Sequence, residues 1–86
     1  MTPPRIQMYT TSWCPYCERA RQLLTQKSVP FEEIDVDARP EARAEMRTRS
    51  GRTTVPQIFI GDRHIGGSDD LYELEAAQGL DPLLKP

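Results

Sequence analysis

The two cysteines of this chain, Cys14 and Cys17, stand where a strand-like run passes into a helix-like run. The residue pattern predicts a strand over residues 5–10 and a helix over residues 15–27. Pro15 fits the first turn of that helix, because the N–H that proline lacks would have no partner there. Both thiols are therefore expected at the N-terminal end of a helix that follows a strand.

The start of a helix changes the chemistry of the first cysteine. The first backbone N–H groups of a helix have no carbonyl partners, and the helix dipole places about half a positive charge there. Both effects stabilise a thiolate at Cys14, whereas Cys17 lies one turn deeper on the same face. We therefore expect Cys14 to be the nucleophile and Cys17 the thiol that resolves its disulfides.

Three other roles for the cysteine pair are weaker. A structural disulfide would close a very short loop, and the entropic gain of a disulfide grows with loop length. A zinc site needs about four ligands, and His64 is the only other soft ligand in the sequence. Two inert buried cysteines would not need a proline between them at a helix start. We therefore expect redox chemistry and no metal site.

Length, charge and hydropathy narrow the class of protein. We expect the 86 residues to form one domain, spanning 1–86, with a single modest core. The net charge of −2 argues against a nucleic-acid partner. No apolar run approaches the ~18 residues of a membrane span, and the first residues lack a signal-like segment. We expect a cytoplasmic protein with no membrane partner, whose thiols are kept reduced and serve in catalysis.

The remaining pattern is that of an α/β protein. Further strands are expected over 31–36, 57–60 and 63–65, with helices over 40–49 and from 68 onward, and a closing turn over 80–84. A strand, a helix and a strand in succession predict a parallel pair of strands. Gly61 and Asp62 predict an antiparallel hairpin between the last two strands. Ser68 is expected to cap the third helix.

The pattern alone does not decide the roles of three arginines and of the single histidine. Arg47, Arg49 and Arg52 cluster near the end of the second helix, where they either compensate the helix dipole or bind an anionic group. His64 has no acidic or nucleophilic partner near it in the sequence, which favours an ordinary strand histidine.

Four short sequence motifs, which occur in the same order along the chain, resemble those of the dithiol glutaredoxins. They are Cys14-Pro15-Tyr16-Cys17, Thr54-Val55-Pro56, Gly66-Gly67 and Ser68-Asp69. The match covers nearly the whole chain, over residues 5–85. The resemblance implies a thioredoxin fold, with a four-stranded mixed sheet and three flanking α-helices. It also implies that the Val55–Pro56 bond is cis and faces the cysteines, with Pro15, Tyr16 and Pro56 supporting the two catalytic thiols.

The same resemblance implies a binding site for glutathione. The backbone of Val55 would pair with the cysteinyl unit, as an added strand does. The start of the third helix, at Gly67, Ser68 and Asp69, would hold the γ-glutamyl carboxylate, and the Asp69 carboxylate would take the ammonium group. The expected glutathione-binding residues are Tyr16, Thr54, Val55, Pro56, Gly67, Ser68 and Asp69.

One position departs from the family pattern. Many glutaredoxins carry Lys or Arg three residues before the first cysteine, and this chain has Thr11 there. The glycyl carboxylate of glutathione needs a cation. Arg47, Arg49 and Arg52 are the candidates to replace the missing one.

The function implied by the resemblance is glutathione-dependent thiol–disulfide exchange. Glutathionylated mixed disulfides would be reduced by Cys14 alone, and protein disulfides by Cys14 and Cys17 together. Glutathione would be reductant and partner of a monomeric enzyme that needs no resident cofactor.

Two alternatives remain open. A thioredoxin-like carrier, reduced by a flavoprotein reductase, would have no use for Gly66-Gly67-Ser68-Asp69. A [2Fe–2S] carrier would bind its cluster through Cys14 and glutathione from each of two subunits. Pro15 makes this less favoured, because relatives that bind a cluster usually have another residue there. A colourless monomer after purification without oxygen would argue against the cluster.

Overall fold

The computed structural model describes residues 4–85, so residues 1–3 and 86 of the expected domain lie outside the described part. In chain order the elements are β1 (Ile6–Thr10), α1 (Pro15–Gln26), β2 (Glu32–Asp35), α2 (Pro40–Ser50), β3 (Gln57–Ile60), β4 (Arg63–Gly66), α3 (Ser68–Ala76) and α4 (Leu80–Leu84). The expected order is confirmed, with boundaries shifted by one or two residues. The closing turn forms the short helix α4, so a fourth helix joins the three that were expected.

The strands form one mixed sheet in the order β2-β1-β3-β4. β1 and β2 are parallel, as predicted for strands joined by a helix, with Tyr9 opposite Ile34. β3 runs antiparallel to β1, and Met8 lies opposite Ile58. The hairpin between β3 and β4 is also confirmed, and Gly61 in its turn has the positive φ of 62° that glycine adopts readily.

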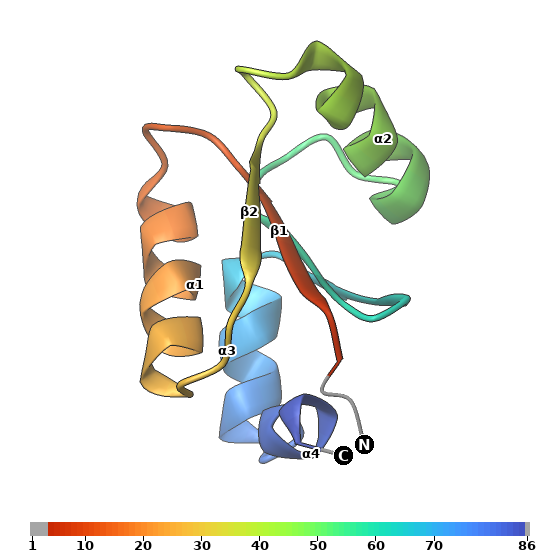
Figure 1. Ribbon diagram of the computed structural model, residues 1–86. Helices are drawn as coiled ribbons and strands as arrows, with labels where there is room; N and C mark the ends of the chain where they lie inside the picture. The colour runs from red at the N-terminus through yellow and green to blue at the C-terminus, as the bar shows by residue number, and fades with distance from the viewer. Residues whose placement is uncertain (1–3, 86) are drawn as a thin grey trace.

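Alternate side chains of β1 enter two different cores. Ile6 and Met8 are buried in the larger core, with apolar residues of α1, α3 and α4. Tyr9 is buried on the opposite face, in a smaller core with Met46 of α2 and Phe59 of β3. Figure 1 shows α2 on one side of the sheet and α1 and α3 on the other. Both faces of β1 therefore carry buried apolar side chains, as suits a strand that is covered on both sides.

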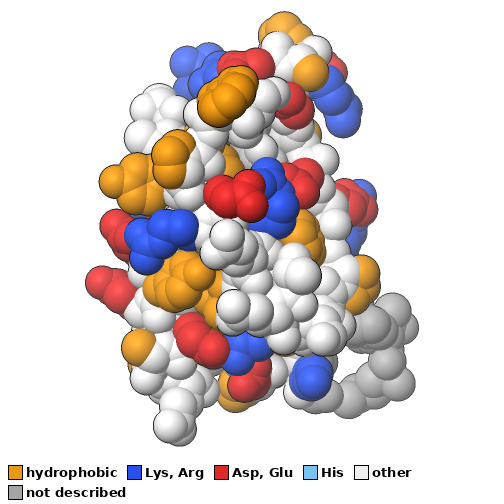
Figure 2. Space-filling model, turned by 90° about the vertical axis from the view of Figure 1, so that its left-hand side faces the viewer, with side chains coloured by type: hydrophobic (Ala, Val, Ile, Leu, Met, Phe, Trp, Pro, Cys, Tyr) orange, Lys and Arg blue, Asp and Glu red, His pale blue; other side chains and the backbone are white. Residues whose placement is uncertain are grey.

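The first helix carries an apolar stripe that is buried against the sheet. Its members are Cys17, Ala20, Leu23 and Leu24. The opposite side of α1 is charged, and Arg21 forms salt bridges with Glu18 and with Glu33 of β2, the latter at 2.7 Å. Figure 2 shows acidic and basic side chains interspersed over this face of the molecule. The register of α1 is therefore set by its apolar stripe, which also fixes where Cys14 lies.

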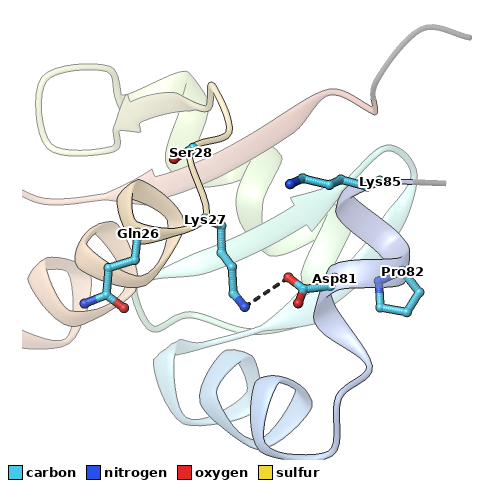
Figure 3. Close-up of a pocket in the computed structure, with 6 residues that line it drawn as sticks. All are labelled: Gln26, Lys27, Ser28, Asp81, Pro82 and Lys85. Atoms are coloured by element: carbon cyan, nitrogen blue, oxygen red, sulfur yellow. Dashed lines mark ion pairs between the residues drawn. The ribbon is translucent and has the colours of Figure 1, made fainter.

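The far end of α1 is tied to the C-terminal helices by Lys27. Its Nζ lies 2.6 Å from Glu75 Oε2 and 2.9 Å from Asp81 Oδ1. Figure 3 shows Lys27 and Asp81 facing each other across a hollow between the end of α1 and α4. These contacts lie at the opposite end of α1 from the cysteines. Among the described residues, no helix has the length and apolar character needed to cross a membrane.

Candidate active site

Cys14 occupies the N-cap position of α1. Its backbone is extended, with φ of −145° and ψ of 106°, and Pro15 begins the helix as predicted. The Cys14 sulfur accepts a hydrogen bond from the backbone N–H of Cys17 at 3.3 Å. It also lies 3.8 Å from the carbonyl oxygen of Val55, to which its thiol donates. One of the unpaired N–H groups at the helix start therefore points at the sulfur, as the sequence predicted.

Cys17 lies behind Cys14 and is almost completely buried, with 1% of its surface exposed. Burial is the largest cause of the raised pKa of the Cys17 thiol, followed by its hydrogen bond and charge interaction with Cys14, and together they bring that pKa to about 11. Cys17 is therefore a neutral thiol at physiological pH. When the Cys14 sulfur is part of a mixed disulfide it carries no charge, so one cause of the raised pKa is removed. Cys17 then deprotonates more readily and can attack.

We expect iodoacetamide to modify only one cysteine of the native protein between about pH 7 and pH 9. The raised pKa keeps Cys17 protonated below about 11, and the folded structure excludes the reagent. Because the pKa of Cys17 is higher in the folded state than in the unfolded chain, the protonated thiol contributes to the stability of the fold. This contribution is fully present below the ordinary pKa of 9.0 and is lost as the pH rises through about 11. Mass spectrometry of digested protein measures which cysteine is labelled. Modification of both at pH 7, without unfolding, would contradict the expected difference.

The loop before β3 brings Val55 and Pro56 to the cysteines. The Val55–Pro56 peptide bond is cis, as the resemblance implied. Gly67 lies against the same loop, since a Cβ built on it would be 3.5 Å from the Pro56 carbonyl oxygen. The starts of α1 and α3 and the loop before β3 thus meet at one end of the sheet (Figure 1).

The start of α3 differs from the expected one. Gly67, not Ser68, occupies the N-cap position, because its extended backbone makes Ser68 the first helical residue. The Asp70 carboxylate does the capping, with Oδ2 accepting from the Gly67 N–H at 2.9 Å. The Gly67 N–H and then Arg52 hold the pKa of Asp70 below its usual value. Ser68 Oγ is buried and has no hydrogen-bond partner among the described residues.

Two exposed aromatic residues lie beside the part-buried Cys14 in the chain. Trp13 is 95% exposed and Tyr16 is 55% exposed, and they are the large hydrophobic residues at the described surface. Asp69 is exposed in the first turn of α3, with Oδ1 3.8 Å from Arg19 Nη1. Trp13 was not singled out from the sequence, although a tryptophan beside a reactive cysteine is a visible signal.

Two of the three candidate arginines already have partners. Arg49 donates to Tyr9 Oη at 2.9 Å and to Gln7 Oε1 at 3.1 Å, and its guanidinium lies 4.0 Å from the centre of the Phe59 ring. Arg52 forms a salt bridge with Asp70 at 2.9 Å. Arg47 is exposed and forms no salt bridge with a described residue. Arg49 therefore holds α2 on the sheet, and Arg52 connects the loop before β3 to the start of α3.

Sequence reasoning also missed a buried polar connection behind the loop. Gln57, the first residue of β3, is fully buried, and its side chain contacts both Thr54 and His64. The sequence signal was a polar residue at the start of an otherwise apolar run, Gln57-Ile58-Phe59-Ile60. Over residues 4–85, no group of three or more His, Cys, Asp or Glu side chains is arranged to hold a metal ion.

A buried, protonated thiol behind an accessible one can close a disulfide with it and reopen it, which is the chemistry of disulfide exchange. This pair and the mixed sheet define a thiol–disulfide oxidoreductase of the thioredoxin fold. The sequence profile of the Glutaredoxin family matches residues 6–65, and the chain belongs to that family.

Relatives and solved structures agree with this assignment. The chain is 59% identical to Glutaredoxin 3 of Escherichia coli strain K12 over 80 residues, which cover 93% of this chain and 96% of that protein. The solution structure of the glutaredoxin of Brucella melitensis matches with a TM-score of 0.86 and 55% identity, covering 99% of this chain and 92% of that one. A buckwheat glutaredoxin–glutathione complex matches with a TM-score of 0.87 and 30% identity, covering 94% of this chain and 76% of that one.

Proposed function

We propose that this glutaredoxin is a glutathione-dependent oxidoreductase that reduces glutathionylated mixed disulfides through Cys14 and protein disulfides through Cys14 and Cys17. The observation that carries the proposal is the position of Cys14. Its sulfur is the N-cap of α1, accepts the Cys17 N–H, and lies beside the Val55 carbonyl. The buckwheat relative, solved as a complex with glutathione, supports the choice of that thiol as reductant.

The single-thiol route uses Cys14 alone. The Cys14 thiolate attacks the glutathionyl sulfur of a mixed disulfide, and the substrate leaves as a thiolate that takes up a proton. A thiolate of a second glutathione then attacks the glutathionyl sulfur bound to Cys14. Oxidised glutathione leaves, and the Cys14 thiolate is restored. The backbone N–H of Cys17 supports the negative sulfur at the start and end of this cycle.

The two-thiol route begins when Cys14 attacks a disulfide in a protein. The resulting mixed disulfide is attacked at the Cys14 sulfur by Cys17, which releases the reduced protein and leaves a Cys14–Cys17 disulfide. Two molecules of glutathione reduce that bond and leave as oxidised glutathione. The exposed rings of Trp13 and Tyr16 beside Cys14 offer apolar contact to a protein substrate.

The proposed glutathione site uses elements that meet near Cys14. The Val55 backbone is beside the sulfur and would pair with the cysteinyl unit of glutathione. The N-terminus of α3 at Gly67, Ser68 and Asp69 would hold the γ-glutamyl carboxylate. The buried Ser68 hydroxyl, which lacks a partner among the described residues, supports a ligand at that helix start. The exposed Asp69 carboxylate would take the ammonium group, with Tyr16, Thr54 and Pro56 lining the remainder.

The test of this function is a coupled assay. Glutathione, glutathione reductase, NADPH and a small glutathionylated disulfide are mixed with the protein, and NADPH oxidation is followed. We expect rapid turnover that depends on glutathione. A protein that is instead reduced directly by a flavoprotein thioredoxin reductase, and is inactive with glutathione, would contradict the proposal.

We expect one of the substitutions Arg47→Ala, Arg49→Ala and Arg52→Ala to raise the apparent KM for the glutathionylated substrate by a few-fold. An exposed ion pair to a carboxylate contributes about 0.2–1 kcal/mol, and this small energy limits the expected rise in KM to a few-fold. Arg47 is the first variant to measure, because Arg49 and Arg52 already have partners within the described chain. Raised salt should weaken substrate use as well, since the cation is exposed.

The matched control for the arginine variants is Asp69→Ala. It removes the proposed partner of the γ-glutamyl ammonium group and should raise the KM more than any arginine variant. The opposing result is specific: three arginine variants equal to the parent, together with a large improvement from Thr11→Lys. In that case no arginine replaces the missing cation, and the glycyl carboxylate is held by backbone or water.

We also propose that the enzyme works as a monomer in the cytoplasm. The motivation is the single nucleophile per chain, which completes the cycle without a second subunit. Sedimentation and the absorbance spectrum of protein purified without oxygen test this. A coloured dimer would favour the [2Fe–2S] carrier instead.

A further inference from the structure

Gln57 is a buried amide at the junction between the active-site loop and the sheet. It directly follows Pro56, and its side chain is fully buried in a strand whose other members are apolar. A buried amide is costly unless its donors and acceptor are used. Gln57 Nε2 lies 3.1 Å from the Thr54 carbonyl oxygen and 3.3 Å from Thr54 Oγ1, and Gln57 Oε1 lies 2.7 Å from His64 Nε2.

The direction of each hydrogen bond follows from the Thr54 carbonyl, which can only accept. The Gln57 side chain must turn its NH₂ group to that carbonyl, so its oxygen faces His64. His64 must then donate from Nε2, which fixes its neutral tautomer with the proton on that nitrogen. The chain of contacts therefore runs in one direction, from His64 through Gln57 to Thr54.

His64 is itself held in place in β4. Its ring packs on the Phe59 ring, with centroids 4.9 Å apart and an interplanar angle of 31°. Burial and the positive charges of Arg52 and Arg49 lower its pKa, and Asp70 opposes this. The remaining charged groups of the adjoining hollow are Arg63 and Glu73. The neutral ring is thus a fixed donor in this environment.

We propose that His64 and Gln57 are positioning residues for substrate binding: they hold the Thr54 carbonyl and hydroxyl, and so fix the loop that presents the Val55 backbone beside Cys14. The inference rests on the proposed function, in which that backbone pairs with the cysteinyl unit of glutathione. Neither residue touches the reacting sulfurs, so their effect is on the orientation of the Val55 N–H and C=O. Substitution of either residue should therefore weaken substrate binding more than it slows the reaction at Cys14.

The test compares His64→Phe, His64→Gln and the parent in the coupled assay. Phenylalanine keeps the packing on Phe59 but removes the donor, whereas glutamine supplies an amide N–H. We expect His64→Phe to raise the KM for the glutathionylated substrate about two- to tenfold, the range expected for one lost hydrogen bond, with little change in kcat. His64→Gln should restore most of the binding. Alkylation of Cys14 by iodoacetamide should keep its parent rate in both variants.

A second substitution, Gln57→Met, removes the same connection from its centre with similar volume. If the three residues act as one chain, the double variant with His64→Phe has no larger KM than Gln57→Met alone. Ile60→Val is the control for general loss of stability, since it removes a buried methylene from the same strand and should leave the KM unchanged.

Three results would overturn the inference. One is a parent-like KM in His64→Phe, and another is a His64→Gln variant as impaired as His64→Phe. The third is an additive KM effect in the double variant. The first would leave the connection a role in stability alone, the second would show that the hydrogen bond from residue 64 is not what fixes the loop, and the third would show that His64 and Gln57 act independently. Failure of the proposed function is distinguished by the parent protein itself, which would show no glutathione-dependent turnover.

Discussion

Replacing Cys14 by serine should abolish turnover of both glutathionylated substrates and protein disulfides. The Cys17→Ser variant should keep its activity on glutathionylated substrates and lose much of its activity on protein disulfides. Serine at position 14 leaves a hydroxyl that is far weaker as a nucleophile toward sulfur. Cys17 cannot substitute for it, because that thiol is 1% exposed, and burial, the largest cause of its raised pKa, remains in the variant. The measurement is the coupled assay with a small glutathionylated disulfide, followed by the same assay with a disulfide-containing protein.

Each cysteine variant serves as the other's control, since both remove one sulfur atom from the same helix start. Thermal unfolding of the two proteins checks that neither has lost its structure. The single-thiol route would be wrong if Cys17→Ser were as inactive as Cys14→Ser on the glutathionylated substrate. That outcome would mean that every turnover passes through the Cys14–Cys17 disulfide.

We expect Gly66→Ala to be the most destabilising of the glycine substitutions, lowering the free energy of unfolding by about 2–4 kcal/mol. Gly66 has φ of 117°, which side chains rarely adopt, and a Cβ there would lie 2.3 Å from Asp70 Oδ2. Asp70 can turn away only by giving up the Gly67 N–H and the Arg52 guanidinium. Urea denaturation measures the loss, and the KM for glutathionylated substrate should rise with it.

The matched control is Gly51→Ala at the end of α2. Gly51 also has a positive φ, of 70°, but a Cβ there would meet no atom within 4 Å. Its substitution should therefore cost only the backbone term, about 1 kcal/mol. If both variants lost the same free energy, the Asp70 carboxylate would be free to move, and its capping of α3 would be of little consequence.

The features that local physics controls could be predicted from the sequence. The cysteine pair at a strand-to-helix junction follows from Pro15 and the apolar stripe of α1, and the structure confirms both. The strand expected over residues 5–10 also forms, and its period of two places Met8 and Tyr9 in opposite cores. These arguments need only the residues within one element and its immediate neighbours.

The features that were missed depend on contacts between elements. Ser68 was expected to cap α3 because of its residue type, but the Asp70 carboxylate accepts the Gly67 N–H in its place. His64 was interpreted as an ordinary strand histidine because no acidic or nucleophilic partner is near it in the sequence, and it does lie in β4. The sequence did not show its hydrogen bond with Gln57 of the neighbouring strand. No periodicity reveals which buried amide meets which ring across a hairpin. Only the folded sheet brings them together.

The central position of β1 has a consequence for the newly made chain. β1 precedes the cysteines in the chain, yet it pairs on one side with β2 and on the other with β3, which ends at Ile60. During synthesis the Cys-Pro-Tyr-Cys segment therefore emerges long before the strand, the loop and the helix that surround it. A nascent chain that ends before residue 55 lacks the Val55 carbonyl beside Cys14, and the complete site forms only once α3 has also been made.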